Sequence, residues 1–172
     1  TKMSIGVLSF SLKGMNHLDF HTDLLQPFNL GYRTGSRLFY NILQIGYGSY
    51  VGLGLLSYGY GIGTEIGPQE KRVHINLETM ARQVLDLNNK QSPLNLNVRF
   101  DPTLNIRLGD KRPAIVLGPS LNLMVSDGVL QNQNSENGKT MGFRDSFPPV
   151  YGDVNSTVEV HFWVGAKLGI RI

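Results

Sequence analysis

Apolar residues occupy every second position over long stretches of the C-terminal half of the chain. Between residues 94 and 108 the apolar positions are Leu94, Leu96, Val98, Phe100, Pro102, Leu104, Ile106 and Leu108, and the intervening ones are Asn95, Asn97, Arg99, Asp101, Thr103, Asn105 and Arg107. Successive side chains of a strand point to opposite faces, so this segment predicts a β-strand with one apolar and one polar face.

The same alternation recurs along the chain, although it is less regular in the N-terminal half. It slips between Tyr47 and Leu55, which predicts a bulge or a hairpin tip there. Altogether the pattern predicts about eight strands, at residues 3–14, 17–26, 35–48, 51–66, 72–85, 93–108, 112–126 and 157–172.

An even number of two-faced strands predicts an all-β protein, a closed antiparallel up-and-down β-barrel that forms one domain over residues 1–172. Short connections at residues 67–70 and 109–111 fall at one end of the array, and a long loop at residues 127–156 falls at the other. Outer-membrane barrels have this asymmetry, which favours a transmembrane barrel.

Strand length indicates which way the apolar face points. A strand of about fifteen residues spans about 50 Å and, tilted near 45°, still crosses an apolar layer of roughly 25 Å, whereas soluble strands usually have about five or six residues. We therefore expect apolar side chains to face lipid.

The polar faces carry charges of both signs, which we expect to pair inside a narrow lumen. The acidic residues are Asp19, Asp23, Glu65, Glu78, Asp101 and Glu159, and the basic ones are Arg82, Arg99, Arg107, Lys167 and Arg171. The charge network is expected to consist mainly of Glu78, Arg82, Arg99, Asp101, Arg107, Glu159 and Lys167.

Composition narrows the classes further. Apolar residues make up 41% and charged residues 17% of the chain, which argues against disorder, and no apolar run is long enough for a membrane helix. The absence of cysteine excludes disulfides and thiolate zinc sites. A net charge of +3 without basic clusters makes nucleic acid an improbable partner.

Candidate chemistry is sparse. His17, Asp19, His21 and Asp23 would share one strand face, but one strand supplies too few converging ligands for a metal. Acid–base chemistry is conceivable at His74, Glu78, Arg82, Glu159 and His161, yet no motif identifies a nucleophilic serine, and structural ion pairing is favoured. Gly59, Gly61 and Gly63 recur at every second position, as the residues on one face of a strand do. We therefore interpret these glycines as making room for neighbouring side chains rather than as a phosphate-binding loop. We predict no catalytic residue, cofactor or metal.

The long loop contains the strongest candidate for a partner surface. Its aromatic and proline-rich part, suited to contact an envelope protein, comprises Phe143, Arg144, Phe147, Pro148 and Tyr151. The alternative is a loop that folds over the mouth of its own barrel.

Two C-terminal strings resemble strands of the small outer-membrane-protein β-barrel family of Gram-negative envelopes. Residues 112–124 (RPAIVLGPSLNLM) are similar to that family's strand of the form "aGPslgl", and residues 163–172 (WVGAKLGIRI) are similar to its closing strand. The resemblance covers mainly residues 70–172 and implies location in the bacterial outer membrane without a shared chemistry.

Together these features predict a non-enzymatic outer-membrane barrel that contacts lipid and serves as a structural or interaction component of the bacterial envelope. One form of this role is a subunit of a larger outer-membrane assembly. Two alternatives stay open. One is a soluble lipocalin-like carrier with its apolar face inside, and the other is a lipid-modifying barrel enzyme.

Overall fold

The computed structural model describes residues 3–5, 8–10, 15–23, 26–50, 53–68, 70–87, 95–109, 113–127, 150–155 and 158–172. These residues form strands joined by turns. The strands are β1 (Met3–Ile5), β2 (Leu8–Phe10), β3 (Met15–Thr22), β4 (Phe28–Gly35), β5 (Tyr40–Tyr50), β6 (Leu53–Ile66), β7 (Val73–Asp86), β8 (Asn95–Arg107), β9 (Ala114–Asp127), β10 (Val150–Asn155) and β11 (Val158–Arg171). Within these ranges there is no helix of the length and apolarity needed to cross a membrane.

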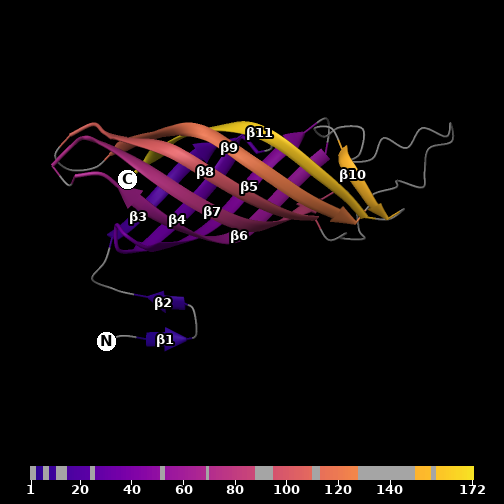
Figure 1. The fold of residues 1–172 in the computed structure, drawn as a ribbon, viewed down its shortest axis with the longest axis horizontal. Coiled ribbons are helices and arrows are strands. Elements are labelled where there is room, and N and C mark those ends of the chain that lie inside the picture. The colour runs from indigo at the N-terminus through magenta and orange to yellow at the C-terminus, as the bar shows by residue number, and fades with distance from the viewer. Residues whose placement is uncertain are drawn as a thin grey trace.

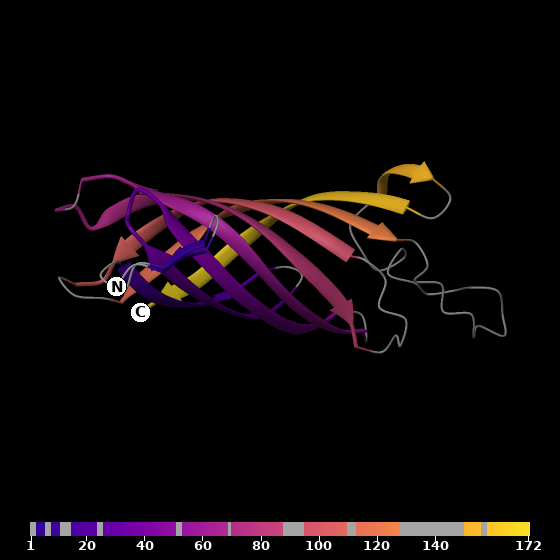
Figure 2. The same ribbon diagram turned by 90° about the horizontal axis from the view of Figure 1, so that it is seen from below.

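Eight of the strands close into an antiparallel barrel. Strands β3 to β9 pair in chain order, and β11 pairs with β9 on one edge and with β3 on the other. Figures 1 and 2 show the resulting cylinder with strongly tilted strands. The prediction of a closed up-and-down barrel of eight strands is confirmed.

The stagger of the strands sets their tilt. A row of directly opposite residues can be followed from strand to strand around the barrel. The row that starts at Asp19 of β3 arrives at His161 of β11, but Asp19 itself pairs with Arg171, which lies ten residues further along β11. The row passes through Gly31, Gln44, Gly59, Arg82, Asn97 and Met124. For eight strands this stagger corresponds to a tilt of about 40°, so a strand of fourteen residues, such as β9, rises about 35 Å along the barrel axis.

Side chains alternate between lumen and outer wall as the period-two pattern predicts. Along β8, Arg99 is 1% exposed and Leu104 is 41% exposed. Leu121 on β9 and Leu168 on β11 are likewise exposed on the outer wall, at 40% and 57%. The apolar face therefore points outward and the polar face inward.

The N-terminal part differs from the prediction. The segment predicted as a barrel strand at residues 3–14 instead contains β1 and β2, which form a separate two-stranded sheet beside the barrel (Figure 1). The eighth wall strand is β4, which the sequence pattern missed. Its alternation is short, because Pro27 precedes the strand and Gly35, whose φ is 144°, ends it.

The predicted 127–156 loop also needs a correction. Within it, β10 pairs antiparallel with the start of β11, from Val150 opposite His161 to Asn155 opposite Val158. The expected hairpin tip near residues 47–55 is confirmed by the pairing of Tyr50 with Leu53. The β6–β7 and β8–β9 turns lie at the same end of the barrel as the last residues of β11 (Figure 1).

Candidate functional site

Charged side chains from strands all around the barrel converge in the lumen. Among the described residues, five acidic and five basic side chains are each at most 5% exposed and engaged in ion pairs. They are Asp19, Asp23, Glu65, Glu78 and Asp101, and Arg33, Arg82, Arg99, Lys167 and Arg171. This set, the lumen network, has balanced charge, as a low-dielectric interior requires.

Glu78 of β7 accepts five hydrogen bonds from described side chains of the lumen. Arg33 donates to both of its oxygens, from Nε at 3.0 Å and from Nη2 at 2.8 Å. Lys167 donates to Oε2 at 2.9 Å, Arg171 to Oε1 at 3.2 Å and Tyr40 to Oε1 at 2.9 Å. One carboxylate thus ties together side chains of β4, β5, β7 and β11.

The network extends from Glu78 toward the end of the barrel where β3 turns into β4. Lys167 also donates to Asp101 at 3.0 Å, and Asp101 lies 3.0 Å from Nε of Arg99. Arg99 and Arg82 both donate to Asp23 Oδ2, at 2.7 Å and 3.0 Å. The turn after β3 is therefore anchored to β7 and β8 across the lumen.

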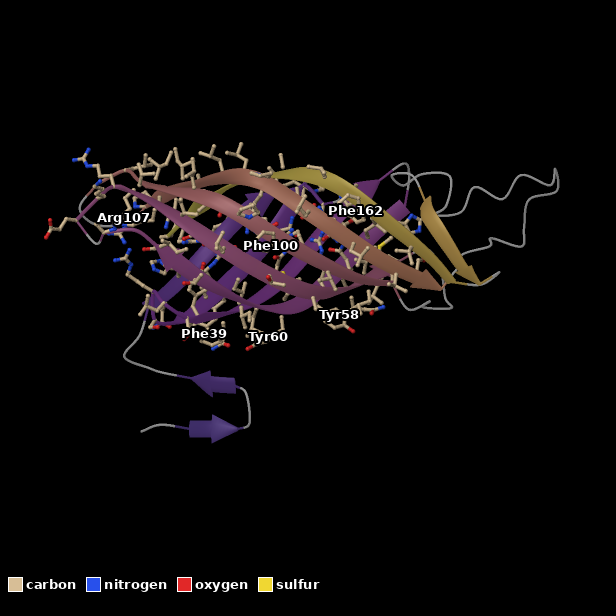
Figure 3. All side chains as sticks on the ribbon, viewed as in Figure 1. Phe39, Tyr58, Tyr60, Phe100, Arg107 and Phe162 are labelled. Carbon is tan, nitrogen blue, oxygen red and sulfur yellow. The ribbon has the colours of Figure 1, made fainter. Side chains whose placement is uncertain are left out.

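At the opposite end, Glu65 of β6 collects donors from the barrel rim. Arg37 donates to Oε1 at 2.7 Å, Arg107 to Oε1 at 3.4 Å and Asn105 to Oε2 at 3.1 Å. Arg107 is 34% exposed, and Figure 3 places it at the left end of the barrel. Arg171 Nη1 lies 3.8 Å from Glu65, which connects this rim cluster to Glu78.

The structure places Glu78, Arg82, Arg99, Asp101 and Lys167 within the lumen network and Arg107 at its rim. Glu159 lies in β11, but its side chain is outside the described part of the structure. Arg33 belongs to the network and was missed because β4 was not predicted. The alternation of Phe28, Leu30 and Tyr32 with Asn29, Gly31 and Arg33 was the signal that could have identified it.

The arrangement does not favour metal binding at the residues that share a face of β3. Asp19 contacts Arg33 and accepts a hydrogen bond from Arg171 at 3.0 Å, and His21 Nε2 lies 3.4 Å from Arg99. Within the described residues there is no group of three His, Cys, Asp or Glu side chains that could hold an ion. The guanidinium groups of Arg33, Arg171 and Arg99 already lie beside Asp19 and His21, where a metal cation would have to bind.

Three serines of the lumen pair with amide side chains. Ser57 donates to Gln26 at 2.5 Å, Asn122 donates to Ser120 at 3.1 Å, and Ser126 donates to Asn95 at 2.7 Å. None of these three contacts has the nucleophile–base geometry that acyl chemistry uses.

The glycines of β6 make room for lumen side chains. A Cβ atom on Gly63 would lie 2.5 Å from the ring of Tyr40, and one on Gly59 would lie 2.6 Å from Cβ of Arg82. Tyr40 fills this space and reaches Glu78.

Most of the predicted partner surface cannot be placed. Phe143, Arg144, Phe147 and Pro148 lie outside the described residues, and Tyr151 lies in β10 with its side chain undescribed. Their interaction with an envelope protein stays a prediction.

The outer wall is predominantly apolar. Exposed leucine, isoleucine, valine, phenylalanine and tyrosine side chains surround the barrel, and Figure 3 shows Tyr58, Tyr60, Phe100 and Phe162 on this wall. Two shallow grooves cross it. One of about 750 Å³ runs over β3, β4, β5 and the end of β11, and one of about 620 Å³ runs from β3 to β7.

No protein-family model matches the chain, and no curated protein or solved structure matches it either.

Proposed function

We propose that the chain is a β-barrel of the bacterial outer membrane that acts as a non-enzymatic structural or interaction component of the envelope. The observation that carries this proposal is the distribution of polarity. An apolar wall surrounds a lumen filled by paired charges, which is the inverse of a protein that folds in water.

The dimensions of the wall support the proposal. Strands of fourteen residues, such as β7, β9 and β11, rise about 35 Å at the tilt set by the stagger, which exceeds the roughly 25 Å of the apolar band of outer-membrane barrels. A closed barrel also leaves no backbone edge at the seam of β3 and β11, where Leu18 and Ile172 exchange hydrogen bonds of 3.0 and 2.9 Å.

The non-enzymatic part of the proposal is supported by the way the lumen is bonded. Its carboxylates accept from arginine and lysine, and its described serines pair with amides. Carboxylates and serines with these partners stabilise a filled lumen. They are not positioned to activate a nucleophile.

The soluble carrier alternative fits the structure poorly. A lipocalin-like protein needs an apolar interior to hold its ligand. Here the described lumen contains ten buried charges among many other buried polar groups. Its nine buried apolar side chains are interspersed with these polar groups, and Tyr40, Ile42 and Met80 form a small cluster among them. An apolar ligand would find little surface inside the barrel.

The direct test is to express the chain behind a signal peptide, fractionate the envelope and compare electrophoretic migration before and after heating. We expect recovery in the outer membrane and a folded species that migrates faster than the heated one. Recovery in the soluble periplasm would contradict the proposal.

A matched pair of variants distinguishes a lipid-facing wall from a water-facing one. Leu121→Arg places a charge on the wall, at a side chain that is 40% exposed. In a bilayer it should cost about 2–4 kcal/mol near the midplane, whereas at an exposed site in water a surface substitution changes stability by only about 0.5 kcal/mol. Leu121→Ile is the control, and both are measured by urea unfolding in lipid vesicles. Equal stability of the two variants would argue against a membrane-facing wall.

A further inference from the structure

The two ends of the barrel differ in charge. At the end where β7 and β9 finish and β11 begins, the charged residues of these strand ends are acidic, namely Asp86, Asp127 and Glu159. At the opposite end, the described turns and the strand end beside them carry four basic residues, which are Arg37, Lys71, Arg72 and Arg107. Glu70 is the exposed acidic residue beside them. We call this second end the basic end.

Backbone hydrogen bonds hold the turns of the basic end against one another. The N–H of Glu65 donates to the carbonyl of Arg37 at 2.7 Å, and the N–H of Arg107 donates to the carbonyl of Arg72 at 2.8 Å. The β4–β5 turn thus lies against the end of β6, and the β6–β7 turn lies against the end of β8. The four cations therefore belong to one continuous surface.

Part of the positive charge of the basic end is not neutralised by the described residues. Arg37 and Arg107 share one carboxylate oxygen, Oε1 of Glu65, to which they donate at 2.7 and 3.4 Å. The side chains of Lys71 and Arg72 are exposed. When the exposed acid of the same turn is included, four cations face two carboxylates, so an excess of positive charge stays at the surface.

Exposed apolar side chains accompany these cations. Leu38, Val73 and Leu108 each directly follow an arginine in the sequence, and they are 81%, 48% and 57% exposed. Phe39 is 50% exposed, and Figure 3 shows it in the same half of the barrel as Arg107. Cations beside exposed apolar side chains match the boundary of a bilayer, where an apolar side chain enters the acyl layer and a cation meets a phosphate group.

We propose that the basic end binds the head groups of anionic phospholipids. The inference rests on the proposed function, because it requires the wall to face lipid. It adds the class of lipid that the barrel selects and the end at which it does so. The phosphate groups accept hydrogen bonds from Lys71 and Arg72, and Leu38 and Val73 enter the acyl layer below them.

Charge and continuity with the wall identify the ligand as a lipid. Ile66 and Val73, which flank the β6–β7 turn, face outward and are 51% and 48% exposed, so the apolar wall extends up to the cations of this turn. A dissolved anion would satisfy the cations but leave Leu38 in water. The acidic residues at the other end of the barrel would repel the same lipid, so the selection concerns the leaflet beside the short turns, which face the periplasm in outer-membrane barrels.

The test uses the full chain, folded in micelles of a non-ionic detergent. The folded barrel is titrated with short-chain phosphatidylglycerol, with phosphatidylcholine of the same chain length, or with inorganic phosphate, and binding is measured by calorimetry. We expect phosphatidylglycerol to bind at least about tenfold more tightly than phosphatidylcholine. Inorganic phosphate should not displace it.

Matched variants probe the charge and the apolar anchor separately. Lys71→Gln/Arg72→Gln should weaken phosphatidylglycerol binding about thirtyfold, since each cation near an anionic membrane surface contributes about fivefold. Glu70→Gln, in the same turn, removes a negative charge and should not weaken it. Leu38→Ser should weaken binding of both lipids. Each variant is compared only after its fast-migrating form in unheated electrophoresis shows that it folds.

The outcomes separate this inference from the proposed function. Equal affinity for the two lipids, displacement by inorganic phosphate, or unchanged binding by Lys71→Gln/Arg72→Gln would overturn the lipid site. The cations would then be left for another anion or for an acidic protein. An equal loss of affinity in Glu70→Gln would also overturn it, because charge would not be the cause. In all these cases a heat-modifiable barrel recovered in the outer membrane leaves the proposed function intact, whereas recovery in the soluble fraction would overturn both.

Discussion

At the scale of single residues, Glu78 shows how the lumen tolerates buried charge. Its carboxylate is 2% exposed and accepts hydrogen bonds from Arg33, Lys167, Arg171 and Tyr40. Desolvation of these ions is costly and is offset only because each has several close partners of opposite sign. Loss of one partner should therefore leave the others uncompensated.

Glu78→Gln should destabilise the barrel by about 3–5 kcal/mol, because three cations would then face a neutral amide. Lys167→Met should cost less, since Arg33 and Arg171 still satisfy Glu78 and Arg99 still pairs with Asp101. The double variant should cost clearly less than the sum of the single ones. The measurement is the free energy of unfolding by urea in detergent, and additive losses would show that Glu78 and Lys167 are not coupled.

At the scale of elements, the seam between β3 and β11 is the shortest junction of the barrel. The two strands pair at four positions, from Leu168 opposite Thr22 to Arg171 opposite Asp19, and the backbone bonds between Leu18 and Ile172 add a fifth, compared with fourteen between β9 and β11. The Asp19–Arg171 ion pair, 3.0 Å long, reinforces it from the lumen side. Closure thus depends on few backbone bonds and one buried ion pair.

A disulfide across this seam should lock the barrel closed. Phe20 lies directly opposite Ile170, and paired residues of this kind have Cα atoms about 5.5 Å apart, within the range for a disulfide. The Phe20→Cys/Ile170→Cys chain should need a higher temperature to lose its fast-migrating form, and a reductant should abolish the difference. Phe20→Cys/Leu121→Cys, whose thiols lie on strands that do not pair, is the control. A failure to form the intramolecular disulfide would contradict the seam register.

At the scale of the whole molecule, the wall and the lumen network form one closed, filled cylinder. Eight strands enclose a space that side chains can fill, and here paired charges of β3, β4, β6, β7, β8 and β11 occupy its middle. The network is electrically balanced, so it offers no net charge to attract permeating ions.

Reconstituted in planar bilayers, the barrel should therefore show no steady ionic conductance. The control is a sixteen-stranded porin in the same preparation, which leaves an aqueous channel. A stable ohmic current from the folded barrel would show that the lumen network opens, and would contradict a structural plug.

The sequence pattern predicted the long strands better than the short ones. Strands β8, β9 and β11 alternate over thirteen or fourteen residues, and their predicted and observed ranges differ by at most two residues. The eight-residue β4 was missed, and the segment at residues 3–14 was wrongly placed in the wall. A short alternating run carries too little periodic signal to distinguish a wall strand from a neighbouring hairpin.

The sequence by itself determined that the protein is built from two-faced strands, because alternation is a local property of consecutive residues. It also determined which charges face inward on the strands that it predicted. Only the tertiary structure decided which strands close the cylinder and which charges pair. Arg33 meets Glu78 across 45 residues and Arg171 meets Asp19 across 152 residues, and such contacts depend on the register of every strand between them, which no local pattern encodes.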